Sequence, residues 1–445
     1  MTLTPELLAK PLAALTTANR AFTAQYPGDS GDRQPVHTVY GGAQLFKAET
    51  AQKMGEIALR SMQEYYPTAA ALGAALDLRA DLAETIFTRV KEKLKREPVE
   101  DFRIDFEDGY GNRPDAEEDG HAISAADEVA RGLASGTLPP YLGIRIKTFS
   151  EELRGRSIRT LDHFITRLAE KTGKKLPPHF FITLPKVVNP EQVQTLATLL
   201  DILEDKLGLP KRALKIELMV ETTQSILRSN GELALPLLVA AAGGRCTGAH
   251  FGTYDYTAGY DITAAYQGMT HPACDFAKHM MKIALAGTGV NLSDGATNVM
   301  PVARHRAAAG QALTVDQVRE NNETVHAASK LHYDQARNSL LNAFYQGWDL
   351  HPAQLITRYA AVYAFFLEGL VPASVRLKNF IEKAAQATLV GDVFDDAATG
   401  QGLLNYFLRG MNCGALTFDE ARVTGLTLDE FRTRSFVKIL AGRRG

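Results

Sequence analysis

The feature that most constrains the fold is a regular alternation of short apolar segments with longer segments of helical periodicity. Eight segments have the β-branched and aromatic content of buried strands, and helical segments separate them along the chain. Parallel neighbouring strands need a helical crossover, and eight such units predict a (β/α)₈ TIM barrel of the α/β class. The expected strands span 36–40, 102–106, 141–146, 180–184, 215–220, 246–251, 289–292 and 343–348.

A doubly wound open sheet is the alternative architecture. It usually has fewer strand–helix units, and no GxGxxG motif follows the first expected strand. Helical segments outside the repeating pattern predict an N-terminal helical extension at 1–34 and a C-terminal helical tail at 371–445, with the barrel domain at 35–370. We expect the last barrel helix to cover 353–368 and to stop at Gly369.

The composition narrows the class of protein. A net charge of -2 argues against nucleic acid and anionic membranes as partners, because proteins that bind them usually carry a basic excess. Three cysteines in 445 residues do not make a disulfide framework, which favours a reducing compartment. The first twenty residues show no secretory signal, and no segment has the length and apolarity of a membrane span. We therefore expect a cytoplasmic protein.

Polar residues follow the expected strands at the end where barrel enzymes place their reactive groups. Glu221 and Asp255 follow neighbouring strands, and Mg²⁺ in proteins is commonly held by one or two carboxylates with water and substrate oxygens. Two other interpretations stay open: Glu221 as N-cap of a helix that begins at Thr222, and Glu217 as a rival ligand deeper in the strand. The polar residues at these strand ends are Asp105, Glu107, Asp108, Arg145, Lys147, Lys186, Glu221, Asp255, Ser293, Asp294 and His351.

The acidic segment after the second strand has two interpretations. Asp105, Glu107 and Asp108 would repel one another unless a cation lies close, but further acids at 115–119 are also consistent with a solvated acidic loop. Arg145 interrupts an apolar strand, so it needs a partner. That partner is either a carboxylate or enolate ligand, or a salt bridge to Asp105 or Glu107.

Three further residues have weaker claims to chemistry. Lys186 would suit a Schiff base, although a solvated strand-end lysine is the more common case. His250 precedes a glycine-rich turn, and His351 precedes a proline. For both histidines a structural role in the core or in a loop is the more common one.

Six short motifs occur in order at the expected strand ends. Together they resemble the HpcH/HpaI aldolase and citrate lyase β-subunit-like family, within the phosphoenolpyruvate/pyruvate-binding barrel superfamily. The first and fourth also resemble motifs of malate synthases, and the likeness covers roughly residues 35–370. The motifs are Asp105-Phe106-Glu107-Asp108, Gly143-Ile144-Arg145-Ile146, Leu184-Pro185-Lys186-Val187, Met219-Val220-Glu221-Thr222, Gly252-Thr253-Tyr254-Asp255 and Leu350-His351-Pro352-Ala353-Gln354.

The resemblance implies a cofactor and a set of site residues. It implies Mg²⁺, with Mn²⁺ as an alternative, bound by the residues that match Glu221 and Asp255. A 2-oxo acid or its enolate would bind this metal and contact Arg145. The remaining implied roles are backbone contacts to the substrate carboxylate from Gly252, Thr253 and Tyr254, and acids beside the metal waters at Glu107 and Asp108.

We therefore expect a Mg²⁺-dependent carbon–carbon lyase or aldolase that acts on a 2-oxo acid or related carboxylate through a metal-stabilised enolate, with Arg145 and Glu107 or Asp108 as catalytic residues. One alternative is a malate synthase-like condensation of an acyl-CoA with a small oxo acid, which needs a base such as Asp294, Asp395 or Asp396. The other is a non-catalytic lyase subunit. The expected partners are a small-molecule 2-oxo acid, with a CoA thioester as a further candidate, and other copies of the chain in a homo-oligomer.

Overall fold

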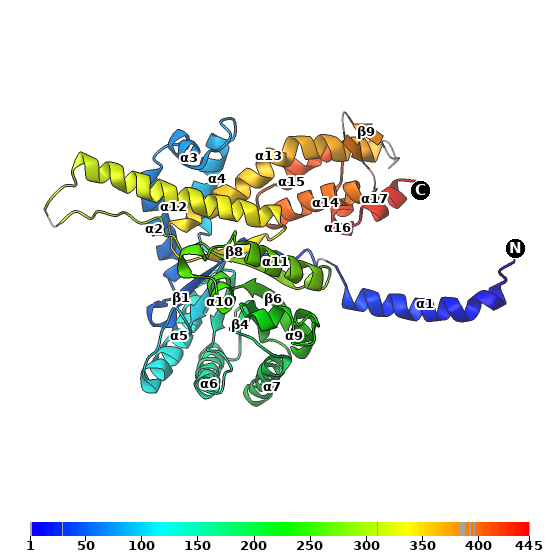
Figure 1. Cartoon of the computed structure of the whole chain (residues 1–445), viewed down its shortest axis with the longest axis horizontal. Helices are drawn as coiled ribbons and strands as arrows, with labels where there is room; N and C mark the ends of the chain where they lie inside the picture. The colour runs from blue at the N-terminus through cyan, green and yellow to red at the C-terminus, as the bar shows by residue number, and fades with distance from the viewer. Residues whose placement is uncertain are drawn as a thin grey trace.

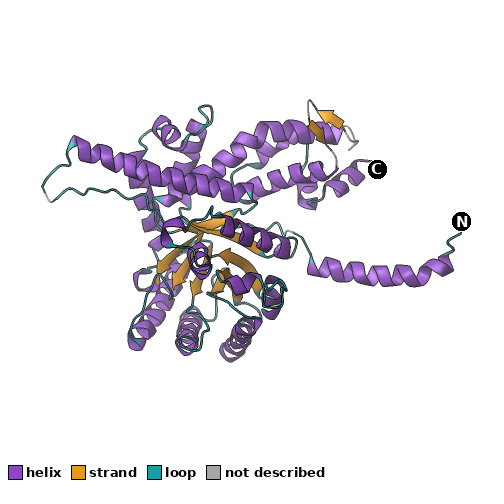
Figure 2. Ribbon diagram, viewed as in Figure 1, coloured by secondary structure: helices purple, strands orange, loops and turns teal. Residues whose placement is uncertain are grey.

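The computed structural model describes residues 2–28, 30–308, 310–382, 388–390, 393–395 and 397–444. Eight parallel strands close into a barrel in sequence order, and helices surround them (Figures 1 and 2). The predicted TIM barrel is therefore confirmed. The barrel strands are β1 (His37–Gly42), β2 (Asp101–Asp105), β3 (Tyr141–Arg145), β4 (His179–Leu184), β5 (Lys215–Val220), β6 (Cys246–Phe251), β7 (Asn291–Ala296) and β8 (Gln346–Asp349).

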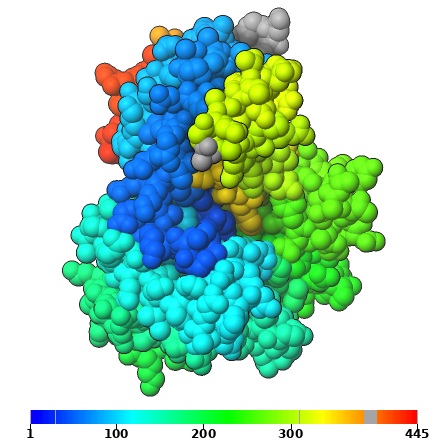
Figure 3. Space-filling view, turned by 90° about the vertical axis from the view of Figure 1, so that its left-hand side faces the viewer, coloured from blue at the N-terminus to red at the C-terminus, as the bar shows by residue number. Residues whose placement is uncertain are grey.

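The helices form a barrel shell, a helical lobe and an N-terminal arm. The arm is α1 (Pro5–Gln25), and the shell contains α5 (Asp115–Ser135), α6 (Arg154–Thr172), α7 (Pro190–Leu207), α8 (Thr223–Ile226), α9 (Leu235–Ala241), α10 (Thr253–Gly259) and α11 (Pro272–Leu285). The lobe contains α2 (Thr50–Tyr65), α3 (Ala69–Leu76), α4 (Ala83–Arg96), α12 (Val315–Leu341), α13 (Gln354–Glu382), α14 (Ala397–Asn412), α15 (Phe418–Ala421), α16 (Leu428–Thr433) and α17 (Phe436–Arg444), with the hairpin of β9 (Thr388–Val390) and β10 (Val393–Asp395). Figure 3 shows α2–α4 and α12 stacked together on one side of the barrel.

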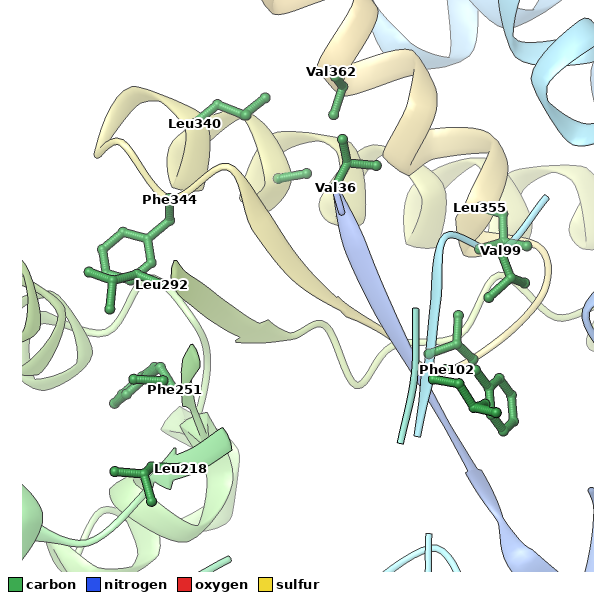
Figure 4. Packing of buried hydrophobic residues seen from close by; sticks show 14 of the residues in the cluster. Val36, Val99, Phe102, Leu218, Phe251, Leu292, Leu340, Phe344, Leu355 and Val362 are labelled. Atoms are coloured by element: carbon green, nitrogen blue, oxygen red, sulfur yellow. The ribbon is translucent and has the colours of Figure 1, made fainter. Parts of the chain in front are cut away.

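Alternate residues of each strand face opposite sides of the barrel wall. Apolar side chains such as Phe102, Leu218 and Leu292 belong to the continuous core between the strands and the helices (Figure 4). The alternate positions are largely polar and form hydrogen bonds with one another across the interior. The wall therefore separates an apolar outer layer from a hydrogen-bonded interior.

Arg103 is the centre of the interior network. Its guanidinium donates to Glu217 Oε2 at 2.6 Å and to Thr183 Oγ1 at 3.0 Å, and it pairs with Asp101. His250 Nε2 lies 2.8 Å from Glu217 Oε2. Burial raises the pKa of Glu217, but Arg103 and His250 outweigh it and hold that pKa well below its usual range. Glu217 is thus committed to the interior and does not serve as the rival ligand.

A second buried network ties the closing strand to the lobe. Asp349, at the end of β8, accepts hydrogen bonds from His332 Nε2 at 2.9 Å and from the Arg358 guanidinium, and it lies 3.1 Å from His37 Nδ1. Burial opposes ionisation of Asp349, but Arg358 and the two histidines lower its pKa well below the ordinary value. This carboxylate therefore joins β1 and β8 to α12 and α13.

Two local predictions about helices were wrong. Residues 115–119 are not a loop but the first turn of α5, where acids interact favourably with the helix dipole and Glu118 pairs with Lys147 at 2.9 Å. Gly369 does not stop α13. A Cβ there would lie 3.0 Å from the Tyr406 hydroxyl, so this glycine permits the close approach of α14. The α13 helix also crosses the proposed boundary at 370/371, and the domain division stays a prediction.

The seventh strand begins later than expected. Gly287 and Gly289 both have positive φ values, so the chain turns there and β7 starts at Asn291. Ser293 and Asp294 consequently lie within the strand and not beyond its end.

Within the described segments α13 is also long and apolar enough to cross a membrane, but half of its most apolar window is buried, where it packs with α4, α12 and α14.

The interior network gives a first prediction. Arg103→Ala should lower the free energy of unfolding by about 3–5 kcal/mol, because it leaves the carboxylates of Asp101 and Glu217 buried without their cation. Urea denaturation measures the change. Arg228→Ala removes the exposed pair with Glu232 and should cost less than about 1 kcal/mol. Equal losses in the two variants would contradict the assigned role of Arg103.

Candidate active site

Four carboxylates from three strand ends converge on one lysine. The Lys186 ammonium, after β4, forms a hydrogen bond with Glu107 and lies 3.3 Å from Asp108 Oδ2 and 3.1 Å from Asp255 Oδ2. The backbone N–H of Lys186 donates to Glu221 Oε1 at 2.7 Å. The ends of β2, β5 and β6 thus place their acids around the end of β4, at the carboxyl end of the barrel.

Lys186 adopts a backbone conformation that is uncommon for a residue with a side chain. Its φ is 50°, in the left-handed region. This conformation occurs where the N–H of Lys186 donates to Glu221. Burial lowers the pKa of the Lys186 amine, but Glu221 and Glu107 raise it above the ordinary value. A lysine that forms a Schiff base needs a lowered pKa, so the site argues against that role.

Glu221 is the most deeply buried of the four carboxylates around Lys186, at 2% exposure. Burial raises its pKa to about 8, and the charges of Asp255 and Glu107 act in the same direction against Lys186 and Arg145. Its interpretation as a helix cap was wrong, because the Thr222 side chain accepts from Ser225 N at 3.1 Å and caps α8. Glu221 is therefore a carboxyl group that an additional cation would help to ionise.

Gly252 allows Glu221 to occupy this position. A Cβ at residue 252 would lie 2.3 Å from Glu221 Oε2 and 2.5 Å from Glu221 Cβ, closer than real Cβ contacts. The segment expected to be a glycine-rich turn is instead α10, with Asp255 in its first turn. Close packing of the β5 and β6 ends thus brings the two predicted metal ligands into one site.

The predicted substrate cradle has fewer available groups than expected. The Tyr254 hydroxyl donates to Ala296 O at 2.9 Å and accepts from Asn298 N at 3.0 Å, so this side chain is tied to the end of β7. Thr253 is buried. The segment Gly252–Asp255 can offer a ligand the backbone N–H groups at the start of α10, because the first N–H groups of a helix have no acceptor within the helix.

Arg145 has the salt-bridge role considered for it, whereas contact with a substrate stays a prediction. Its guanidinium binds Asp105 through two hydrogen bonds, of 2.7 and 2.6 Å, and its Nη1 lies 3.1 Å from Glu107 Oε2. It also lies over the Tyr40 ring, 4.9 Å from the ring centre. Asp105 therefore fixes the orientation of Arg145, and the remaining edge faces the acids of the site.

The pKa values of Glu107 and Asp108 shift in opposite directions although the two residues are neighbours. Burial raises the pKa of Glu107 above its ordinary value, against the effects of Arg145 and Lys186. The Asp108 side chain is 60% exposed, and the same two cations outweigh its partial burial and lower its pKa. Glu107 is thus the better suited of the two to hold a proton.

Tyr40 and Trp348 are parts of the site that the strand-end positions did not reveal. Their ring centroids are 4.5 Å apart, and with Met219 and Ala296 they form an apolar cluster near Arg145. Trp348 Nε1 is buried with no hydrogen-bond partner among the described residues. The sequence signal was the alternation of β1 and β8, which turns residues 40 and 348 inward together. An apolar floor of this kind strengthens nearby electrostatic interactions.

Other strand-end residues do not reach the site. Lys147 is buried between Phe106 O and Glu118. Asp294 is fully buried, 3.2 Å from Lys278 Nζ, and accepts a hydrogen bond from Ser339, so its prediction as a base at the barrel mouth was wrong.

The remaining residues have structural roles or lie outside the description. His250 pairs with Glu217, and His351 accepts from Ala353 N at 3.2 Å. The side chain of Asp395 and all of Asp396 lie outside the described residues.

The described residues contain no group of three or more His, Cys, Asp or Glu side chains arranged to hold a metal ion. A two-carboxylate site for Mg²⁺ needs only Glu221 and Asp255, with water and substrate oxygens completing the shell. Both residues contact Lys186, Asp255 through the ammonium and Glu221 through the backbone N–H, so they lie at one location. The donor set consists of hard oxygen atoms, which fits Mg²⁺.

Comparison with known proteins identifies the family. The domain of unknown function DUF6986 matches residues 15–439. The chain belongs to this family. No curated protein matches.

Solved structures share the fold of this family member. A citrate lyase from Burkholderia xenovorans LB400 is similar at 17% identity, covering 88% of this chain and 96% of that one, with a TM-score of 0.57. A Haloferax volcanii malate synthase in complex with magnesium and glyoxylate is similar at 14% identity, covering 93% and 98%, with a TM-score of 0.46. The citrate lyase likeness supports the barrel fold, whereas the expected HpcH/HpaI family stays a prediction.

The contact at Gly252 gives a second prediction. Gly252→Ala should destabilise the protein by about 1–3 kcal/mol, because the new methyl group displaces the Glu221 side chain. Gly259→Ala, in the same short helix, is the matched control: no atom lies within 4 Å of its Cβ position, so it should change stability by less than about 1 kcal/mol. Urea denaturation compares them, and identical midpoints would refute the close contact.

The pKa of Glu221 gives a third. The folded protein retains a proton on this group up to about pH 8, whereas the unfolded chain loses it near its ordinary value of about 4.3. Unfolding free energy should therefore fall as pH rises through this window. The side chain that Glu221→Gln introduces cannot ionise, so the unfolding free energy of this variant should fall less steeply as pH rises. Urea denaturation in the presence of a chelator measures both slopes, and parallel slopes would contradict the raised pKa.

Proposed function

We propose that this DUF6986 protein is a Mg²⁺-dependent carbon–carbon lyase or aldolase that acts on a 2-oxo acid or related carboxylate. The observation that carries the proposal is the convergence of Glu221, Asp255 and Arg145 at one barrel end. Two acids suited to a hard cation and one arginine suited to a carboxylate match the needs of such a substrate. The likeness to a citrate lyase structure is compatible with this chemistry.

In this proposal Glu221 and Asp255 hold Mg²⁺, with Mn²⁺ as the alternative ion. When bound, the cation would supply Lewis-acid stabilisation of negative charge on the substrate's carbonyl oxygen. Lys186 keeps the acids close together, since it contacts Asp255 through its ammonium and Glu221 through its backbone N–H. The ammonium stabilises a cluster of like charges that would otherwise repel one another.

Arg145 would bind the same substrate from the side of β3. Asp105 occupies two of its nitrogens and thereby fixes the plane of the guanidinium. The Nη1 atom, 3.1 Å from Glu107, is directed toward the acids of the site. A preorganised donor of this kind stabilises developing negative charge without reorienting during the reaction. The Tyr40 and Trp348 rings, which lie beside the Arg145 guanidinium, would limit the access of water to it.

Glu107 would carry the proton. It is within hydrogen-bonding distance of Lys186, and burial raises its pKa, which favours its protonated form relative to an exposed glutamate. Asp108 is more exposed and has a lowered pKa, so it would remain ionised. Glu107 is therefore the group that we assign to proton transfer at the substrate carbon.

The malate synthase-like condensation has less support in the chain's own residues. It needs a further base at the barrel mouth, and Asp294 is buried against Lys278. The non-catalytic subunit makes a different prediction, namely a stable hetero-complex and no turnover by the isolated chain. Lyase activity of the purified chain therefore separates the three functions.

A turnover assay with matched variants tests the proposal. The purified chain should cleave a member of a 2-oxo acid panel only when Mg²⁺ is present. Glu221→Ala and Asp255→Ala should each lower kcat/KM by at least about 100-fold, because each removes one of two metal carboxylates. Asp429→Ala is the control, since that exposed acid pairs with Arg432 on α16, in the helical lobe.

Three outcomes would overturn the proposal. Full activity in either site variant would remove the metal assignment, and turnover in excess chelator would remove Mg²⁺. Release of free thiol from acetyl-CoA with glyoxylate, without 2-oxo acid cleavage, would favour the condensation.

A further inference from the structure

The N-terminal helix α1 contributes no residue to the hydrophobic core of the described chain. It spans Pro5–Gln25 and buries none of its residues. Figures 1 and 2 show it projecting away from the barrel and the lobe. Most of the stability of a helix in a protein comes from packing of its apolar face, and Pro11 removes one of the internal hydrogen bonds of α1. Its stability in solution therefore calls for another surface.

Four large apolar residues of α1 form one stripe along the helix. Leu8, Leu12, Leu15 and Phe22 follow a spacing that places them on one face, with Asn19 between them. Leu12, Leu15 and Phe22 are 50%, 53% and 63% exposed. By the same helical period, the ionisable residues of α1 fall on the opposite face: Glu6, Lys10 and Arg20. The helix is thus amphipathic with nothing covering its apolar side.

A second exposed apolar face lies on α11. Phe276 and Ile283 are seven residues apart and therefore share one face, and they are 48% and 72% exposed. The partly buried Met280 lies between them and continues the apolar face. This face points away from the barrel, because the alternate residues of α11 are buried against it.

The C-terminal ends of the two helices that carry these apolar faces, α1 and α11, lie at the same corner of the molecule. Gly28, shortly after α1, donates a backbone hydrogen bond to Gly287 O at 2.8 Å, just beyond the end of α11. A two-fold axis beside this corner would carry each α1 across the α11 of the other copy. Such an interface is isologous, so both contacts form together and the assembly closes as a dimer.

We propose that two copies of this chain form a dimer by exchanging α1, whose apolar stripe packs on the outward face of α11 of the second copy. The inference concerns assembly and does not depend on the proposed lyase activity. The stripe itself carries no ionisable residue, so no charged group is desolvated at its centre. Each exposed apolar side chain would bury on the order of 100 Å², and two reciprocal contacts reach roughly 1,000 Å², which a specific interface needs.

Size-exclusion chromatography with light scattering tests the exchange. The full chain should have the mass of a dimer. Leu12→Glu/Leu15→Glu and, separately, Ile283→Glu should each shift it to the mass of a monomer, because both place charge in the apolar contact. Thr17→Glu is the matched control, since Thr17 lies opposite the stripe and the variant should remain a dimer. Circular dichroism confirms that the exposed substitutions leave the fold intact.

Mixing the two monomeric variants sharpens the test. The arm variant has an intact α11 and the Ile283→Glu variant has an intact α1, so the mixture should regain dimers through one of the two contacts. A dimeric Ile283→Glu variant alongside a monomeric arm variant would refute the contact with α11. A monomeric full chain, or a dimer unaffected by the arm substitutions, would refute the exchange altogether.

Discussion

The Lys186 ammonium is the interaction on which the arrangement of the barrel mouth depends. Acids after β2, β5 and β6 lie around it, and without a cation their mutual repulsion would separate them. The left-handed backbone at residue 186 accompanies a second contact, from its N–H to Glu221. One residue therefore contacts three acids through its ammonium and a fourth through its backbone N–H, and a cation that joined the site would share those acids with it.

The polar interior of the barrel supports this mouth from below. Arg103, Glu217 and His250 complete one another's hydrogen bonds and charges, so the carboxylate of Glu217 stays ionised in the interior. Glu221 follows four residues later on the same strand but lacks an equally close pair of cations, and its pKa rises to about 8. A glutamate within β5 thus has a lowered pKa where two cations pair with it, and a glutamate directly after β5 has a raised pKa where they do not.

Much of the fold was predictable because strand and helix periods are local properties of the sequence. The eight barrel strands follow from them, and so does the placement of Glu221 and Asp255 after neighbouring strands. The errors arose where the role of a residue depends on a contact with another residue that is distant in the sequence. Gly369 looks like a helix stop but makes room for Tyr406, and Asp294 resembles an exposed base but pairs with Lys278. The roles of Tyr40 and Trp348 likewise depend on the meeting of the first and last strands.

Gly252 connects the fold to the proposed chemistry. Its lack of a side chain lets the β6 end approach Glu221, and the helix that starts at the next residue brings Asp255 to the same place. A larger residue at 252 would preserve the strand and its hydrogen bonds yet move Glu221 away from Asp255. A larger residue at this position would therefore disturb both the packing at the barrel end and the two-carboxylate site. The constraint that glycine meets here is one of distance between two acids and not one of backbone conformation.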